Sequence, residues 1–210
     1  MASSTLAAAD QRRLLVLGSS VAEGFNAEAN FGWAQRMAKA LASQGVQTEN
    51  RAEAGTNTDF WQEYWQEKVT SEELASFDIV LMSLSLANEG LPCLETPEEM
   101  DALTDRYLEG YKAIVQALRR HLVKPGARMV VGCPYPNEDY EEAHLVRLER
   151  VRDTVRSWPE VDYAIDFLQP PVHRGSGRWR AGLASDAGHP NDEGHAQMLA
   201  CVDLNKVLGK

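Results

Sequence analysis

The first apolar run of the chain is Leu14-Leu15-Val16-Leu17, and it leads directly into Gly18-Ser19-Ser20. A short apolar run that ends at a glycine is typical of a buried strand entering a turn. Further apolar runs predict strands at residues 46–51, 79–84, 129–131 and 163–167. Amphipathic stretches predict helices at residues 33–43, 59–68, 97–122, 141–157 and 192–208.

Predicted strands and helices therefore alternate along the chain. Such alternation predicts a parallel sheet with helices on both faces, because consecutive parallel strands are joined by crossover connections. We expect one three-layer α/β domain over residues 11–210, with about five strands in a flavodoxin-like order. Thr96-Pro97-Glu98-Glu99 has the capping threonine, first-turn proline and third-position glutamate of a helix start. Residues 1–10 are expected to form a flexible N-terminal tail.

The composition is that of an ordinary globular protein, with 44% hydrophobic and 25% charged residues in a chain of 210. The net charge of −10 disfavours nucleic acid and anionic membranes as partners, since both reward clustered lysine and arginine. No apolar run approaches the roughly 20 residues that span a bilayer, and the first ten residues do not resemble a signal peptide. A cytoplasmic location is the expectation. Three cysteines without a CxxC pair indicate neither a disulfide framework nor a zinc knuckle.

The run Asp186-Ala187-Gly188-His189-Pro190-Asn191 carries the groups that a serine nucleophile needs. A serine hydroxyl is a weak nucleophile until an imidazole accepts its proton, and the imidazole needs a fixed tautomer and orientation. Asp186 lies three positions before His189 and can reach its ring from the same loop. With Ser20 after the first predicted strand, the pattern predicts a serine hydrolase.

Two further segments can supply an oxyanion hole: Glu53-Ala54-Gly55-Thr56-Asn57 follows the second predicted strand, and Leu86-Ala87-Asn88-Glu89-Gly90 follows the third. The backbone N–H of Gly55 and the side-chain amide of Asn88 can join the N–H of Ser20 around a developing negative charge. Because ligands of open α/β sheets bind beyond the carboxyl ends of the strands, we expect these segments to converge there.

The order Ser, Gly, Asn, His resembles the SGNH (GDSL-type) hydrolases, which are named for those four catalytic residues. The resemblance runs from Gly18 to His195 and rests on the GxSxxxG of Gly18, Ser20 and Gly24 together with the DxxHPN run. It implies an α/β hydrolytic enzyme that needs no metal or cofactor. It also implies a role for each residue already singled out: nucleophile Ser20, base His189, its partner Asp186, and oxyanion donors Ser20, Gly55 and Asn88.

Three positions depart from the family pattern. Ser19 replaces the usual acidic residue before the nucleophile, Leu86 replaces the usual glycine two places before the asparagine, and Glu89 replaces the usual aspartate. No proton-transfer group is lost, but the bulk of Leu86 is expected to alter the shape of the substrate site. The Gly-x-Ser-x-Gly elbow is absent, which argues against the α/β-hydrolase class.

Other interpretations remain open for several residues. Ser20 can cap the helix after the first strand, and Gly55 and Asn88 can be ordinary turn residues. His189, Asp192 and His195 have the spacing of metal ligands on a helix, although the turn at Pro190-Asn191 makes it unfavourable for one helix to include His189. His195 is better explained as a packed histidine of the last helix.

Two groups of larger side chains flank the motifs. Trp61, Tyr64 and Trp65 have helical spacing, and such a stripe is more often core than substrate platform. A Gly-rich loop before Asp186 carries several basic and aromatic residues, which can contact an anionic or sugar-like substrate or lie in solvent: Arg174, Arg178, Trp179 and Arg180.

We therefore expect a serine ester hydrolase of small acetyl-like oxygen esters, with Leu86, Arg178 and Trp179 as candidate substrate contacts. Its partner is a small-molecule ester; the oligomeric state cannot be read from the sequence. An acyl-thioesterase or lysophospholipase of the same family is the nearest alternative. A non-catalytic binding module on this fold would explain the changes at Ser19 and Leu86, but it would also be expected to have lost the serine, histidine or aspartate.

Overall fold

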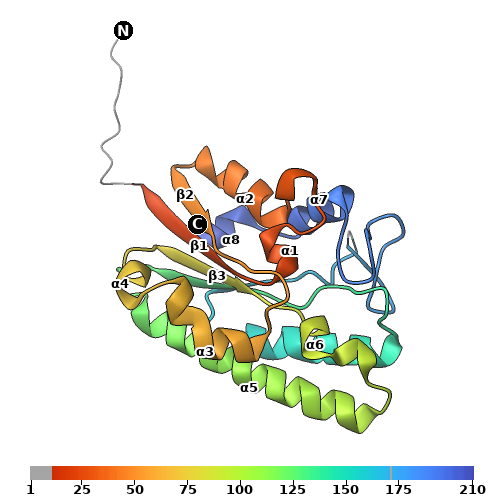
Figure 1. The fold of residues 1–210 in the computed structure, drawn as a ribbon. Helices are drawn as coiled ribbons and strands as arrows, with labels where there is room; N and C mark the ends of the chain where they lie inside the picture. Colours follow the sequence, from red (N-terminus) through yellow and green to blue (C-terminus); the bar gives the residue numbers. More distant parts are fainter. Residues whose placement is uncertain (1–10, 171) are drawn as a thin grey trace, which may run out of the picture.

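A computed structural model describes residues 11–170 and 172–210 of the chain (Figure 1). Its centre is a sheet of five parallel strands in the order β2-β1-β3-β4-β5. The strands are β1 (Arg12–Gly18), β2 (Val46–Asn50), β3 (Ile79–Ser83), β4 (Arg128–Gly132) and β5 (Tyr163–Ile165). The expected α/β domain and its flavodoxin-like order are confirmed, and the predicted strand ends agree with the observed ones to within two residues. The expected tail, residues 1–10, lies outside the described residues.

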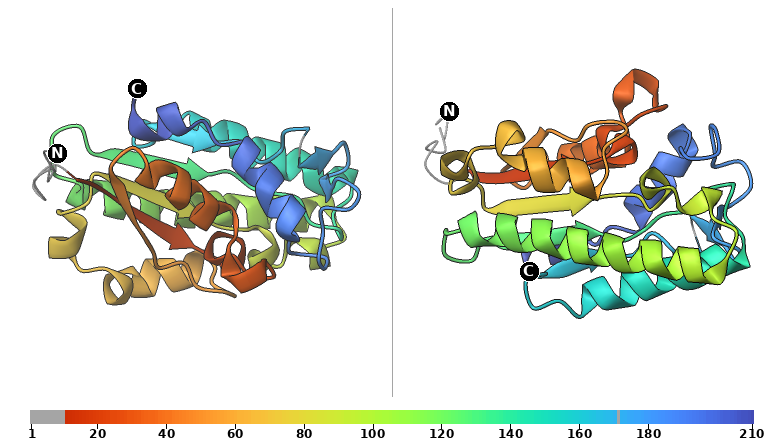
Figure 2. Two further views of the ribbon diagram at one scale, coloured as in Figure 1. Left: turned by 90° about the horizontal axis from the view of Figure 1, so that it is seen from above. Right: turned by 60° about the horizontal axis from the view of Figure 1, so that its bottom comes forward.

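Helices cover both faces of the sheet, as Figure 2 shows in two further views. One face carries α3 (Thr58–Lys68), α4 (Ser71–Leu74), α5 (Pro97–His121) and α6 (Glu142–Arg156). The other face carries α1 (Ser20–Glu23), α2 (Trp33–Ala42), α7 (Asp192–Ala200) and α8 (Leu204–Leu208). Because successive strand residues point to opposite faces, β3 contributes Val80 and Met82 to one apolar core and Ile79 and Leu81 to the other.

Short elements connect these layers. Three 3-10 helices occur in the described loops: η1 (Glu28–Asn30), η2 (Ala87–Glu89) and η3 (Leu91–Cys93). A small antiparallel hairpin, β6 (His173–Arg174) and β7 (Arg178–Trp179), precedes the DxxHPN run. The sequence patterns did not predict these elements, because each is too short to show a period.

Two helix predictions have clear physical support in the structure. At the start of α5, Thr96 Oγ1 accepts a hydrogen bond from the N–H of Glu99 at 3.3 Å, which is the predicted capping box. On α3, Trp61 and Trp65 are buried in the core, so the core interpretation of the aromatic stripe is confirmed for these two side chains. The indole N–H of Trp61 also donates to Thr56 Oγ1 at 2.9 Å.

The prediction of one helix over residues 192–208 is wrong, because α7 ends at Ala200 and α8 begins at Leu204. Asp203 causes the restart: its Oδ1 accepts hydrogen bonds from the N–H groups of Asn205 at 3.0 Å and Lys206 at 3.2 Å. This is the geometry of an N-cap, and it satisfies N–H groups that a continuous helix would have bonded internally.

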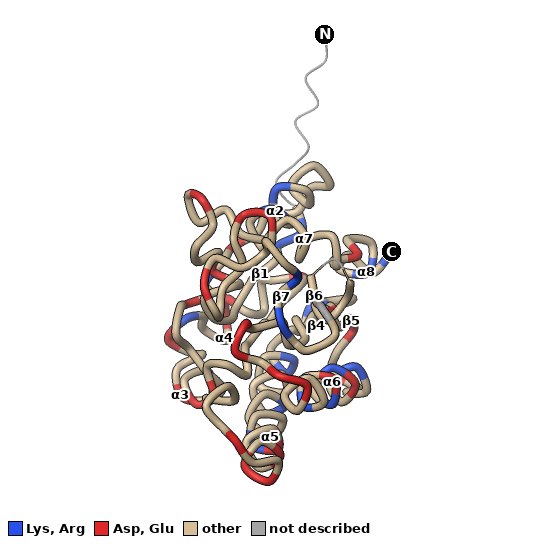
Figure 3. The backbone as a smooth tube through the Cα atoms, turned by 90° about the vertical axis from the view of Figure 1, so that its right-hand side faces the viewer, with Lys and Arg blue, Asp and Glu red and all other residues tan. Residues whose placement is uncertain are grey.

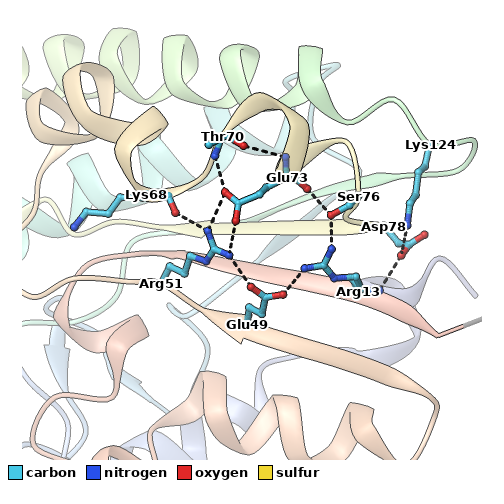
Figure 4. Close-up of polar contacts among 9 residues, drawn as sticks. All are labelled: Arg13, Glu49, Arg51, Lys68, Thr70, Glu73, Ser76, Asp78 and Lys124. Atoms are coloured by element: carbon cyan, nitrogen blue, oxygen red, sulfur yellow. Dashed lines mark hydrogen bonds and ion pairs between the residues drawn. The ribbon is translucent and has the colours of Figure 1, made fainter. Parts of the chain in front are cut away.

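A network of charged side chains joins α4 to strands β1 and β2 (Figure 4). The guanidinium of Arg51 donates to Glu49 at 2.8 Å and to Glu73 at 3.2 Å, and Glu49 also pairs with Arg13. Burial tends to raise the pKa of Glu49, but the hydrogen bonds from Arg13 and Arg51 outweigh it and lower that pKa. The network lies beside α4, at the end of the sheet away from α1 (Figure 1), and links the edge strand β2 to β1 and α4.

No helix in residues 11–170 and 172–210 has the length and apolar character that crossing a membrane requires.

Candidate active site

The end of β1 is shaped by close backbone packing against β3. Gly18 has φ +149°, and a Cβ at this position would lie 2.1 Å from the carbonyl oxygen of Ser83. The glycine lets the chain turn sharply from the strand into α1, where Ser20 is the first residue. Ser20 is 5% exposed, and its N–H, at the first position of a helix, has no acceptor within that helix.

The structure brings Ser20, His189 and Asp186 together from opposite ends of the chain. His189 Nε2 lies 2.9 Å from Ser20 Oγ. The other ring nitrogen, Nδ1, lies 2.8 Å from Asp186 Oδ1 and 3.0 Å from Oδ2. This continuous chain of hydrogen bonds can move a proton from the hydroxyl to the imidazole while the carboxylate holds the ring.

The loop that carries Asp186 and His189 is closed by its own hydrogen bonds. Asp186 Oδ1 accepts the backbone N–H groups of Gly188 and His189, both at 2.9 Å. The N–H of Ser185 donates to the carbonyl oxygen of His189, and Ala184 forms a bridge with Pro190. Burial tends to raise the pKa of Asp186, but the bonds from His189 and Gly188 outweigh it and hold that pKa below its ordinary value. Asp186 is therefore ionised at neutral pH.

Gly55 and Asn88 also meet beside the end of β1. Gly55 has φ +78° and lies in a turn whose bonds run from the N–H of Glu53 and the hydroxyl of Thr56 to the carbonyl oxygen of Gly18. These bonds do not use the Gly55 N–H. The amide of Asn88 donates to the carbonyl oxygen of Thr56 at 2.8 Å, and the second amide proton is left for another acceptor.

Glu89 attaches the Asn88 segment to the start of α3. Its Oε1 accepts the N–H of Thr58 at 2.8 Å, and its Oε2 accepts the Thr58 hydroxyl at 3.2 Å. Burial raises the pKa of this carboxyl, although the bonds from Thr58 act in the opposite direction. The residue that departs from the family pattern here thus satisfies a helix N-terminus and fixes η2 in place.

Ser19 is the other polar residue that departs from the family pattern. It directly precedes Ser20 and is fully buried. Its hydroxyl lies 3.3 Å from the hydroxyl of Tyr135. Burial raises the pKa of Tyr135, although hydrogen bonds with Ser19 and Ser85 act in the opposite direction. A neutral hydroxyl pair therefore occupies the position before Ser20, where the sequence resemblance led us to expect an acidic residue.

The structure corrects the expectation that Leu86 and Trp179 contact substrate. Leu86 is 1% exposed and Trp179 is fully buried, so both side chains are enclosed in the apolar cores. Trp179 stacks on Tyr135 with ring centroids 6.2 Å apart. Arg178 is partly exposed, but its Nε donates to the carbonyl oxygen of Tyr140 at 2.7 Å, which assigns it a role in fixing the hairpin. Figure 3 shows this basic segment at β7, on the side of the molecule where α7 also lies.

The metal interpretation of His189, Asp192 and His195 finds no support in their contacts. His195 is fully buried, with Nδ1 accepting the N–H of Trp33 and Nε2 bonded to the carbonyl oxygen of Phe25, both at 3.2 Å. Asp192 pairs with Arg36 at 3.1 Å. Within the described part of the chain, no three histidine, cysteine or acidic side chains are grouped as a metal site.

Sequence reasoning missed two residues that contact Asp186 and His189. The amide of Asn26 donates to Asp186 Oδ2 at 2.8 Å, and the ring of Phe25 lies 4.8 Å from the His189 ring. Both follow Gly24 in the loop between α1 and α2. Only the position of the loop, directly after the GxSxxxG run, could have pointed to them.

Fold and site together define the class: a hydrolytic enzyme built on one three-layer α/β domain, with its serine at the end of the first strand. The model of the GDSL-like lipase/acylhydrolase family matches residues 16–197, and the chain belongs to this family. No curated protein matches the sequence significantly.

Several solved structures share the fold. A lipase from a goat rumen metagenome has a TM-score of 0.73 at 16% identity, with 91% of this chain and 95% of that chain covered. A lipase/acylhydrolase from Enterococcus faecalis has a TM-score of 0.67 at 15% identity, covering 95% and 96%. An acetylxylan esterase from Geobacillus stearothermophilus has a TM-score of 0.64 at 15% identity, covering 93% and 94%. At these identities the likeness is one of fold.

Proposed function

We propose that the protein is a serine esterase that removes small acyl groups, acetyl above all, from oxygen esters. The observation that carries the proposal is the chain of hydrogen bonds from Ser20 through His189 to Asp186, with Oγ–Nε2 and Nδ1–Oδ1 distances of 2.9 and 2.8 Å. Membership of an acylhydrolase family supports the same chemistry.

In the first half of the reaction, Ser20 Oγ attacks the carbonyl carbon of the ester while His189 Nε2 takes the hydroxyl proton. The carbonyl oxygen becomes negatively charged and accepts hydrogen bonds from the N–H groups of Ser20 and Gly55 and from the amide of Asn88. His189 then returns the proton to the departing alcohol oxygen, and an acyl-serine remains.

In the second half, a water molecule replaces the alcohol. His189 takes a proton from the water as its oxygen attacks the acyl carbon, and the same three donors hold the second oxyanion. Collapse of this intermediate releases the carboxylic acid and returns the proton to Ser20 Oγ. Asp186 stays ionised throughout, because its role is to orient the ring and to stabilise the imidazolium.

The scarcity of exposed apolar side chains near His189 favours a small acyl group over a long one. Among the described residues, the large hydrophobic side chains that are well exposed are Phe25, Phe31, Val123 and Val146, and of these Phe25 contacts His189. A long acyl chain requires a wide apolar surface, whereas one aromatic ring is enough for an acetyl or propionyl group. The presence of an acetylxylan esterase among the structures of similar fold agrees with this choice.

The test combines labelling with a series of substrates. A fluorophosphonate probe should modify Ser20, located by mass mapping of the labelled peptide, and Ser20→Ala should abolish both labelling and turnover of a chromogenic acetate ester. Ser19→Ala is the matched control and should keep both, because its hydroxyl faces Tyr135. Rates should fall from acetate through butyrate to octanoate.

Three results would count against the proposal. An adduct on Ser19 would reassign the nucleophile. Faster turnover of acyl thioesters or of lysophospholipid than of acetate esters would move the substrate class to the family's other activities. A folded wild-type protein that neither labels nor turns over any of these esters would favour a binding module.

A further inference from the structure

The carboxylate of Asp186 is held from two directions. Oδ1 accepts the N–H groups of Gly188 and His189 and faces the His189 ring, so these donors all belong to its own loop. Oδ2 accepts the amide of Asn26 at 2.8 Å, across 160 residues of sequence. Among the described residues, Asn26 is the donor that reaches Asp186 from outside the loop of residues 184–190.

Asn26 belongs to a connection, residues 24–32, that has an unusual backbone. Asn26, Ala29 and Asn30 have φ values of +64°, +53° and +54°, a region that side-chain-bearing residues rarely occupy. Such conformations cost free energy and persist only where the surroundings impose them. Asparagine tolerates this region better than most residues, which suits position 26 for an amide that must point at Asp186.

The first turns of α7 impose this backbone. Asp192 Oδ1 accepts the N–H of Glu28 at 3.2 Å and pairs with Arg36. The buried His195 accepts the N–H of Trp33 at Nδ1, so its proton is on Nε2, which donates to the carbonyl oxygen of Phe25. α7, which begins three residues after His189, is therefore hydrogen-bonded near both ends of the connection that carries Asn26.

The same connection continues from the helix that carries the nucleophile. Ser20 opens α1, and the chain reaches Asn26 six residues later, after the turn at Gly24. One short segment thus supplies the hydroxyl that bonds His189 Nε2 and the amide that bonds Asp186 Oδ2. The ring of Phe25, between them in sequence, packs against His189.

We propose that Asn26 is a positioning residue, whose amide holds Asp186 and through it the His189 ring in register with Ser20. This inference rests on the proposed esterase mechanism. Without the amide, the loop of residues 184–190 keeps its internal bonds but loses its tether to the nucleophile segment. Because small displacements of a catalytic group reduce the rate strongly, the effect falls on kcat, with little change in KM.

The first test removes the side chain at matched positions. Asn26→Gly deletes the amide while keeping a residue that adopts positive φ without strain, and Asn30→Gly does the same at the other asparagine of the connection. For Asn26→Gly we expect kcat on a chromogenic acetate ester to fall about tenfold, the lower end of the range for losing one hydrogen bond to a charged group, because the site is partly exposed. The kcat of Asn30→Gly should stay within about twofold of the wild-type value. A difference of this size is clearly smaller than the effect expected from one lost hydrogen bond.

The second test uses charge and does not depend on stability. Asn26→Asp keeps the shape and places a second carboxylate beside Asp186, which favours the protonated form of the His189 ring. The neutral ring is the active form, so the acidic limb of the kcat/KM profile should move to higher pH. Asn30→Asp adds the same charge elsewhere in the connection and should move the limb less. Both variants retain the other charged or titratable groups of this connection and of the elements packed against it and the Asp186 loop, which include Glu28, Arg36, Lys39, Glu138, Asp192 and His195.

Circular dichroism and thermal melting establish that each variant is folded. The inference is overturned if Asn26→Gly keeps wild-type kcat, or if Asn26→Asp and Asn30→Asp have the same acidic limb. Failure of the proposed function is a different result, because the wild-type protein itself would then neither label with the fluorophosphonate nor cleave the ester.

Discussion

In the proposed mechanism, Asn88 is the side chain on which the oxyanion hole depends most directly. One proton of its amide is committed to the carbonyl oxygen of Thr56 at 2.8 Å, which fixes the plane of the group. The other proton is then presented in a direction that the backbone turn determines. This arrangement is what preorganisation means for a single side chain: the donor is in place before the charge develops.

Replacing Asn88 by alanine should lower kcat by about a hundredfold to a thousandfold, since loss of one oxyanion donor typically costs about 2.7–4 kcal/mol. Stability should fall by only about 1 kcal/mol from the lost bond to Thr56. Asn57→Ala is the matched control, because Asn57 caps α3 by accepting the N–H of Phe60 at 3.0 Å. This variant should lose a similar amount of stability, while its kcat should change little. Steady-state kinetics of both variants measure the predicted difference in kcat, and thermal melts measure the predicted similar loss of stability. An Asn88→Ala rate within a few-fold of wild type would return Asn88 to the role of a turn residue.

His195 makes the stability of the protein dependent on pH. Burial lowers the pKa of its imidazole to about 4, whereas a histidine in the unfolded chain titrates at about 6.5. Between these values the unfolded state binds a proton that the folded state does not, so stability falls as the pH drops through this window. The stabilising contribution of neutral His195 is fully present above about pH 6.5. Its loss lowers the free energy of unfolding by roughly 3 kcal/mol at most.

Urea unfolding of wild type and His195→Gln at several values between pH 7.5 and 4 tests this. The glutamine loses the bond to the N–H of Trp33 or to the carbonyl oxygen of Phe25, so the variant is less stable at neutral pH. Its stability should nevertheless depend less steeply on pH. Burial also lowers the pKa of His144 and His173, so both proteins keep some slope and the comparison is between slopes. Equal slopes would show that His195 is accessible to protons in the folded state.

At the scale of elements, the close approach of β1 to β3 determines the position of Ser20, the proposed nucleophile. The two strands pair up to Gly18 opposite Ser83, and the N–H of Ser19 continues the ladder to the carbonyl oxygen of Ser83. The turn that carries Gly55 is bonded to the carbonyl oxygen of Gly18. The ends of three neighbouring strands therefore meet at one glycine.

Gly18→Ala should disrupt this junction, because its Cβ would lie 2.1 Å from a backbone oxygen that cannot move without separating the strands. We expect loss of several kcal/mol of stability, or an insoluble protein, as is usual when a side chain is forced into tightly packed backbone. Gly45→Ala is the control: Gly45 also has positive φ, but a Cβ there meets nothing within 4 Å. Its cost should be about 1–2 kcal/mol from backbone strain alone. Equal melting temperatures for the two variants would contradict the argument.

At the scale of the whole molecule, the site is assembled from the carboxyl ends of strands and from the loop before α7. The segments are anchored in both helix layers: those of Ser20 and His189 adjoin α1 and α7 in one layer, and those of Gly55 and Asn88 adjoin α3 and α5 in the other. The sheet lies between the two layers, and residues that are spread from Ser20 to His189 in the sequence meet at its end.

A metal-independent, histidine-dependent rate should follow from this assembly. We expect EDTA to leave ester hydrolysis unchanged, because His195 and Asp192 use their polar atoms to hold the connection between α1 and α2. The rate should fall on the acidic side as the imidazole of His189 is protonated. Loss of activity in EDTA with recovery on adding zinc or manganese would make the serine mechanism untenable.

Much of this molecule could be read from the sequence because the signals are local. The apolar runs and amphipathic stretches predicted all five strands of the parallel sheet and the longer helices, since burial imposes a period on the residues of each element. The Gly18–Ser20 and Asp186–Asn191 segments pointed to the residues that the structure brings together, because each chemical role needs a particular side chain beside a turn.

The tertiary structure decided what depends on residues far apart in the chain. It enclosed Leu86 and Trp179 in the cores and divided the last predicted helix at Asp203, which no local period could indicate. It also placed the amide of Asn26 on Asp186, 160 residues away. Packing between the layers determines such contacts. The sequence therefore determined which chemical groups were available, and the arrangement of strands and helices determined which side chains meet at the site.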